Sequence, residues 1–153
     1  MIEGHFVRLR AFERGDVDAN HAFVNDRETL RGMLSGIPFP SSMEDEYRWL
    51  EQQTSYSRGE YQFAIEDAEG DLVGRCGVIR VDWKNRVGEL AIMIGTPYRG
   101  RGYGKEAMLC HKSQVKHGWQ VEDGGENDNS LFGLYFTCVG PDEAKNDFLE
   151  HIE

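Results

Sequence analysis

The sequence predicts an α+β fold, in which helices and the strands of a sheet occupy separate stretches of the chain. Three observations carry this prediction. Helical patterns come early, in residues 16–24 and from Ser41 onwards, and three segments expected to be strands then follow one another in residues 61–95. A glycine-rich loop finally joins the last strand to a helix that includes Lys105. No linker or internal repeat interrupts the chain, so we expect one domain over residues 1–153.

Each element has a local signal. Residues 6–11 alternate between apolar and polar side chains, which predicts a first strand. Residues 61–67, 72–81 and 87–95 are also expected to be strands, and the first two of these are joined by a turn at 69–71. Val17 and Phe23 give the first helix an apolar face. Ser41-x-x-Glu44 is typical of a capping box and predicts the start of the second helix.

Composition limits the class of protein. A formal charge of −10 argues against a nucleic-acid partner; it fits attraction of cationic amines, simple solubility or an acidic proteome from a salty habitat. No apolar run approaches the roughly 18 residues of a membrane span, and no signal-peptide pattern opens the chain. The three cysteines and five histidines lack the spacing of a disulfide framework or a metal site. We therefore expect a cytoplasmic protein without a metal, nucleic-acid or membrane partner.

The most informative segment is Arg99-Gly100-Arg101-Gly102-Tyr103-Gly104, which lies between a predicted strand and a predicted helix. Backbone N–H groups at a helix N-terminus bind anions, and glycine lets phosphate oxygens approach the backbone. The segment therefore predicts a phosphate-bearing cofactor held by the main chain. A glycine-rich turn without a ligand is the alternative.

Two other phosphate loops fit this segment less well. A P-loop requires Ser or Thr where Glu106 stands. Gly102-x-Gly104-x-x-Ala107 satisfies the dinucleotide fingerprint, but that fingerprint belongs to the first turn of a large doubly wound sheet. Too few residues follow it here, so an NAD- or nucleotide-binding enzyme is disfavoured.

The pattern Arg99-x-x-Gly102-x-Gly104, together with residues 81–95 before it and 105–108 after it, resembles the GNAT acyltransferase superfamily. Residues 7–13 and Asn25-Asp26 look like the branch with ribosomal-protein N-terminal and spermidine acetyltransferases. The resemblance covers about residues 5–109. It implies a mixed, mostly antiparallel sheet with helices on both faces. It also implies direct acetyl transfer from acetyl-CoA to a primary amine of a peptide, polyamine or other small molecule, and it allows a homodimer.

The resemblance also implies which residues hold coenzyme A. Backbone groups of Ile92, Met93 and Ile94 would contact the pantetheine arm, and one of their N–H groups would polarise the thioester carbonyl. The pyrophosphate would lie on the N–H groups of Arg99, Gly100, Arg101, Gly102, Tyr103 and Gly104. Asn127 opens a segment that resembles a later motif of the family and is a further cofactor-binding candidate.

Glu89 is the candidate catalytic base. Two-residue alternation places it with Val87, Ala91 and Met93, a mostly apolar face on which desolvation would raise the pKa of a carboxyl group. An ordinary cross-strand contact with a neighbouring arginine, Arg80 or Arg86, is the alternative interpretation.

Three further residues of the first half are open between two interpretations. Two interpretations apply to Met33, Tyr47 and Trp49: they line the acceptor pocket, as the family's first two helices do, or they pack in the core.

Tyr135 is the candidate acid that protonates the departing thiolate. It lies in a segment whose spacing departs from the family by about one residue.

After Leu109 the resemblance ends. Residues 110–125 show neither a long apolar helix face nor an alternating strand, and every arginine lies at or before Arg101. Residues 141–152 predict a short amphipathic helix. We therefore expect an incomplete or irregular fold after residue 109. Two explanations remain open: a reading-frame disturbance or degenerate terminus, giving a module that binds coenzyme A without turnover, or a divergent C-terminal part that works.

Overall fold

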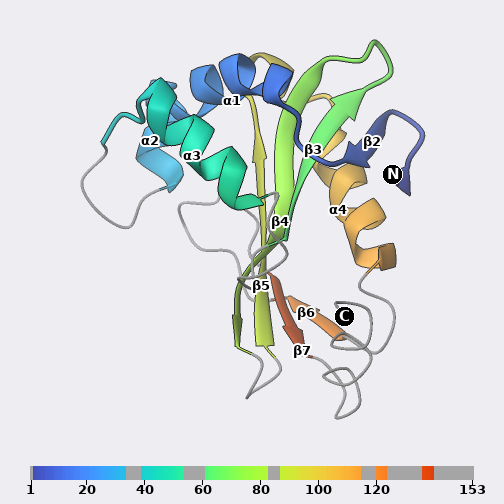
Figure 1. Cartoon of the computed structure of the whole chain (residues 1–153). Helices are drawn as coiled ribbons and strands as arrows, with labels where there is room; N and C mark the ends of the chain where they lie inside the picture. The colour runs from blue at the N-terminus through green and yellow to red at the C-terminus, as the bar shows by residue number, and fades with distance from the viewer. Residues whose placement is uncertain are drawn as a thin grey trace.

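A computed structural model describes residues 2–33, 39–53, 61–82, 87–114, 120–123 and 136–139, with backbone only at 32–33, 79–82, 87–90 and from 111 onwards. An antiparallel sheet carries helices on both faces (Figure 1), so the predicted α+β class is confirmed. The elements are β1 (Ile2–Glu3), β2 (Val7–Arg10), η1 (Arg14–Asp16), α1 (Val17–Val24), α2 (Arg27–Met33), α3 (Met43–Gln53), β3 (Tyr61–Asp67), β4 (Leu72–Asp82), β5 (Val87–Ile94), η2 (Thr96–Tyr98), α4 (Tyr103–Gln114), β6 (Gln120–Asp123) and β7 (Phe136–Val139).

In the described residues, seven strands form one sheet in the order β1-β2-β3-β4-β5-β7-β6, and each described pair is antiparallel. β4 and β5 form a long pair in which Cys76 lies opposite Ile92. On its other side, β5 pairs with β7 only over Val87–Leu90. The second half of β5 therefore has β4 on one side and no described strand on the other.

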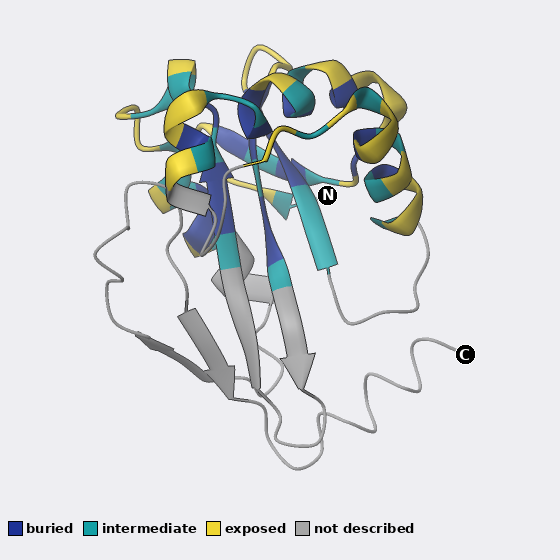
Figure 2. Cartoon of the chain, turned by 90° about the vertical axis from the view of Figure 1, so that its left-hand side faces the viewer, coloured by how far each residue is buried: buried dark blue, intermediate teal, exposed yellow. Residues whose placement is uncertain are grey.

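Two apolar cores cover the two faces of the sheet. Because side chains alternate along a strand, neighbouring residues serve opposite cores. Ile92 packs with Met108 of α4, whereas Met93 packs with Phe23 of α1 and Leu50 of α3. Figure 2 shows the buried residues gathered where the helices lie over the strands, with exposed residues on the outer sides of the helices. β5 is thus covered by α4 on one face and by α1 and α3 on the other.

Charged groups anchor the N-terminal segment to the sheet. Arg10 donates to both carboxylate oxygens of Asp16, at 2.7 and 2.8 Å, and also bonds to Glu66 of β3, which Arg8 contacts as well. Asp16 and Glu66 are both buried. The arginines therefore neutralise two carboxylates that would be costly to bury alone.

The structure corrects three details predicted from the sequence. The capping box of α3 lies one residue later than expected: Ser42 and Asp45 bond reciprocally, with Asp45 N–H to Ser42 Oγ at 3.1 Å and Ser42 N–H to Asp45 Oδ2 at 3.3 Å. Helix α2 was not predicted. Residues 110–125 contain the end of α4 and strand β6, although their sequence shows neither a long apolar helix face nor an alternating strand pattern. The expected helix at 141–152 lies outside the described residues.

Candidate functional site

The chain turns sharply between β5 and α4. After η2, Arg99 is extended, with φ −68° and ψ 157°. Gly100 and Gly102 then take φ values of +75° and +85°, which residues with a Cβ adopt only at a cost. A Cβ at either position would meet no heavy atom within 4 Å. Backbone conformation therefore demands glycine here, and the space beside the loop backbone is open.

The loop ends at the N-terminus of α4. The first hydrogen bond within the helix runs from the Glu106 N–H to the Gly102 carbonyl at 3.1 Å. The N–H groups of Tyr103, Gly104 and Lys105 therefore precede the helix's own hydrogen-bond ladder. The helix dipole adds partial positive charge at the same place. This geometry suits a phosphate or a carboxylate.

The second half of β5 offers backbone groups beside this loop. The Gly95 N–H donates to a carbonyl of β4 at 2.9 Å, so Met93, two residues earlier, also points its N–H and C=O toward β4. The corresponding groups of Ile92 and Ile94 point to the opposite edge. No strand within the described ranges pairs with that edge beyond Leu90. Residues 92 and 94 therefore present an edge to which an extended chain could bond.

The Arg99 side chain turns back into the protein. Its Nε donates to the Ile94 carbonyl at 2.9 Å, Nη2 donates to Thr29 Oγ1 at 2.8 Å, and Nη1 lies 3.2 Å from Glu28 Oε2. The Arg99 N–H bonds to the Thr96 carbonyl at 3.4 Å. Arg99 thus belongs to the loop but directs its donors at the chain itself.

The other predicted loop residues lie nearer the surface. Arg101 is exposed, and its guanidinium carbon lies 5.8 Å from the centre of the Tyr98 ring. Tyr103 is partly buried against the core beneath α4. The ideal Cβ of Gly104 would lie 3.5 Å from Ile94, so α4 begins directly against β5. Arg101 is the loop arginine that could meet a ligand from the surface.

The candidate base lies in a fully paired part of β5. Glu89 stands opposite Ile79 of β4 and Thr137 of β7. Its side chain, like all of Tyr135 and Asn127, lies outside the described residues. Phe136, which follows Tyr135, pairs with Leu90. The catalytic roles of Glu89 and Tyr135 and the cofactor role of Asn127 stay predictions.

The aromatic residues considered for the acceptor pocket pack at the edge of a core. Trp49 meets Phe12 edge-to-face with ring centres 4.9 Å apart, and the Arg75 guanidinium lies 4.7 Å from the centre of the Trp49 ring. Tyr47 packs against the same core and beneath Arg14. These contacts favour the core interpretation. The Met33 side chain lies outside the described residues.

The residues that join α2 to the loop were not predicted from the sequence. Asp26 Oδ2 accepts from the Thr96 hydroxyl at 2.9 Å and from the Thr29 N–H at 3.1 Å, while the Asp26 carbonyl accepts from the Leu30 N–H. Asp26 therefore caps α2 and holds η2. The local signal was readable, because Asp followed by Glu28 in the first turn is typical of a helix start.

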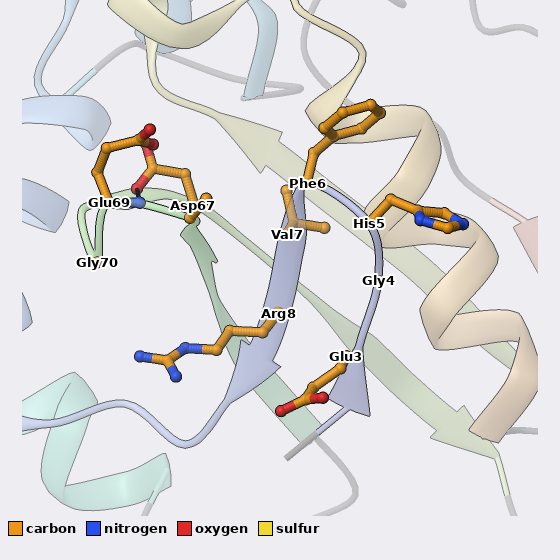
Figure 3. Close-up of a pocket in the computed structure, with 10 residues that line it drawn as sticks. Glu3, Gly4, His5, Phe6, Val7, Arg8, Asp67, Glu69 and Gly70 are labelled. Carbon is orange, nitrogen blue, oxygen red and sulfur yellow. Dashed lines mark hydrogen bonds between the residues drawn. The ribbon is translucent and has the colours of Figure 1, made fainter.

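A separate cavity of about 320 Å³ lies between the β1–β2 and β3–β4 turns (Figure 3). Its lining mixes acidic residues with Arg8 and His5, and it includes none of the predicted site residues. The Glu106 carboxylate of α4 accepts hydrogen bonds from the His5 and Phe6 N–H groups and so fixes the first of these turns.

None of the helices in the described ranges has the length and apolar character needed to cross a bilayer.

By its fold and its site the chain is an α+β protein whose central strand runs into a glycine loop and a helix N-terminus, an arrangement suited to a phosphate-bearing cofactor. More particularly, it belongs to the acetyltransferase (GNAT) domain family, whose model matches residues 7–125. That match extends beyond residue 109, where the resemblance was expected to end.

Two curated relatives match part of this chain. It is 29% identical over 99 residues to a spermidine N(1)-acetyltransferase of Vibrio cholerae, covering 65% of this chain and 56% of that protein. It is 30% identical over 106 residues to an uncharacterized SPbeta prophage-derived N-acetyltransferase of Bacillus subtilis, covering 69% and 57%. The chain thus spans just over half the length of these relatives.

Solved structures show the same fold at low identity. A microcin C7 self-immunity acetyltransferase in complex with acetyl-CoA and AMP has a TM-score of 0.63 at 10% identity, covering 90% of this chain and 94% of that one. A Vibrio cholerae spermidine N-acetyltransferase in complex with CoA and spermine has a TM-score of 0.55 at 16% identity, covering 94% and 98%.

Proposed function

We propose that the chain is an N-acetyltransferase that moves an acetyl group directly from acetyl-CoA to a primary amine. The observation that carries the proposal is the junction of β5 and α4. There, two positive-φ glycines open a helix N-terminus beside the free edge of β5, the edge beyond Leu90 with which no described strand pairs. Membership of the acetyltransferase family supports it, as do structural neighbours that were solved in complex with CoA or acetyl-CoA.

The residues present fit this cofactor in two places. The pyrophosphate would lie on the N–H groups from Gly100 to Lys105, because the Arg99 N–H is already bonded to Thr96. The amides of an extended pantetheine arm would bond to Ile92 and Ile94 along the free edge of β5. Acetyl-CoA would supply the activated thioester, while an N–H at this edge would polarise its carbonyl.

Proton transfer completes the proposal. Glu89 would take the proton from the attacking amine, and Tyr135 would protonate the leaving thiolate. Glu89 lies three residues before Ile92, the first residue of the free edge, on the same strand. Phe136, the neighbour of Tyr135, pairs with Leu90. For the acceptor, the name of the spermidine-acetylating relative supports a polyamine, while the overall negative charge supports a cationic amine in general.

The test begins with binding. Acetyl-CoA should raise the melting temperature of the purified chain and give a measurable Kd by calorimetry, whereas NAD should do neither. Gly102→Val, which places a branched side chain at a φ of +85° beside the loop, should abolish the effect of acetyl-CoA.

Turnover is tested with a panel of polyamines, peptide N-termini and aminoglycosides, by following the release of free CoA thiol against a blank without amine. Amine-dependent thiol release by at least one panel member supports the acetyltransferase. Binding of acetyl-CoA without release for any amine would support a module that binds coenzyme A without turnover. Stabilisation by NAD alone would overturn both interpretations.

A further inference from the structure

Arg99 carries a positive charge into the candidate phosphate loop, yet its side chain is engaged elsewhere. We propose that Arg99 is a positioning residue that holds the glycine loop and the first turn of α2 against the end of β5, without contacting phosphate. The inference rests on the proposed function, because it concerns how the loop is kept ready for coenzyme A.

Three acceptors that Arg99 contacts come from different parts of the chain. Ile94 is the last residue of β5, and Thr29 and Glu28 belong to the first turn of α2, about 70 residues earlier in sequence. Thr29 is fully buried, whereas Glu28 is largely exposed. An exposed ion pair contributes little, so the bonds to Thr29 and to the Ile94 carbonyl matter most.

A second link strengthens the same junction. Asp26 caps α2 and accepts from the Thr96 hydroxyl at 2.9 Å. This bond, together with the Thr29 N–H, holds the pKa of Asp26 below its usual value, because both donors favour the charged carboxylate. Helix α2 has only seven residues, too few to be stable alone. Its position therefore depends on these links to residues 96–99.

Release of Arg99 toward a phosphate would be costly. The guanidinium would have to leave the buried Thr29 hydroxyl and the Ile94 carbonyl, and both would lose a charged hydrogen-bond donor. The planar guanidinium of Arg99 (its fork of N–H donors) reaches three separated acceptors at once. The single ammonium group of a lysine cannot reproduce this arrangement of donors. Arg101, exposed on the same loop, has no such constraint and serves as the matched control.

Charge and position can be separated with two substitutions. Arg99→Lys keeps the charge but loses the fork, and Arg99→Gln loses both. A positioning role predicts that both raise the Kd for coenzyme A about tenfold, the effect of one charged hydrogen bond. A phosphate contact predicts that the lysine variant keeps the wild-type Kd, and that result would overturn the inference.

A double-mutant cycle tests whether Arg99 acts through α2. Thr29→Val removes the buried hydroxyl at nearly constant volume and should also raise the Kd. Combined with Arg99→Gln, it should add almost nothing, whereas Thr29→Val combined with Arg101→Gln should show independent effects. Full additivity between positions 29 and 99, about a hundredfold in total, would refute the positioning role.

The two proposals fail in different ways. If wild-type protein with native circular dichroism does not bind coenzyme A, the proposed function falls, and the inference that rests on it falls too. If the wild type binds but the Arg99 variants and the cycle behave as a phosphate contact would, only the inference falls. Circular dichroism of each variant confirms that the compared proteins are folded.

Discussion

Gly102 and Gly70 form a matched pair for testing the candidate phosphate loop. Both have positive φ, +85° and +93°, and an ideal Cβ at either position meets no heavy atom within 4 Å. Alanine should therefore introduce the same backbone strain at both sites, about 1–2 kcal/mol. For a protein of this size, that strain lowers the melting temperature by about 2–8 °C. Thermal unfolding without ligand should show similar losses for Gly70→Ala and Gly102→Ala.

The two variants should differ only in binding coenzyme A. Gly70 lies in the β3–β4 turn, whereas Gly102 immediately precedes α4. A methyl group at Gly102 would hinder the approach of phosphate, and the loss of one charged hydrogen bond raises Kd about 10- to 150-fold. Calorimetry should show this weakening for Gly102→Ala and a wild-type Kd for Gly70→Ala. Equal Kd values for the two variants would refute the assignment of the loop.

Three further predictions concern catalysis, acid stability and thiol chemistry. Glu89→Gln should lower kcat by about 10²–10⁴ while leaving the Kd for acetyl-CoA within twofold, and a kcat within threefold of wild type would exclude Glu89 as the base. Asp16→Asn should cost about 2–4 kcal/mol at pH 7 by urea unfolding, because it leaves Arg10 without its bidentate partner. Burial opposes ionisation of Asp16, but the bonds from Arg10 and Glu13 outweigh it and lower the pKa of Asp16 below 3.8. The stabilisation from Asp16 is therefore full above that value and is lost as the pH falls through the native pKa. The acid-unfolding profile of Asp16→Asn should lack this loss. Burial raises the pKa of the Cys76 thiol to about 12, so iodoacetamide at pH 8 should modify Cys76 at least a thousandfold more slowly in native protein than in urea, and equal rates by mass spectrometry would contradict its burial.

The glycine loop could be predicted from the sequence because its determinants are local. Gly100 and Gly102 supply the positive φ values, and the residues that follow form a helix on their own signals. The direction of the Arg99 side chain depends instead on Thr29 and Glu28, which are about 70 residues away in sequence. No local pattern distinguishes an arginine that faces a ligand from one that faces a helix.

The capping box of α3 shows how tertiary contacts choose between equal local signals. Two serines precede three acids, so both Ser41-x-x-Glu44 and Ser42-x-x-Asp45 fit the pattern. Glu46 resolves the choice, because its buried carboxylate accepts from the Ser41 hydroxyl at 2.6 Å and from Asn20 of α1 at 2.7 Å. Ser41 is thereby engaged with Glu46, and Ser42 becomes the cap. A contact with another helix therefore moves the helix start by one residue.

The end of the β5–β7 pairing decides which backbone groups the site can offer. Among the described strands, β7 covers β5 only up to Leu90, so the free edge begins with the next outward-facing residue, Ile92. Arg99 occupies the Ile94 carbonyl, which leaves the Ile92 N–H and C=O and the Ile94 N–H on that edge. Because the groups alternate along the strand, a shift of one residue in the β4–β5 register would turn Met93 outward instead. The register that packs Ile92 under α4 and Met93 under α1 and α3 therefore also fixes the edge available to a cofactor.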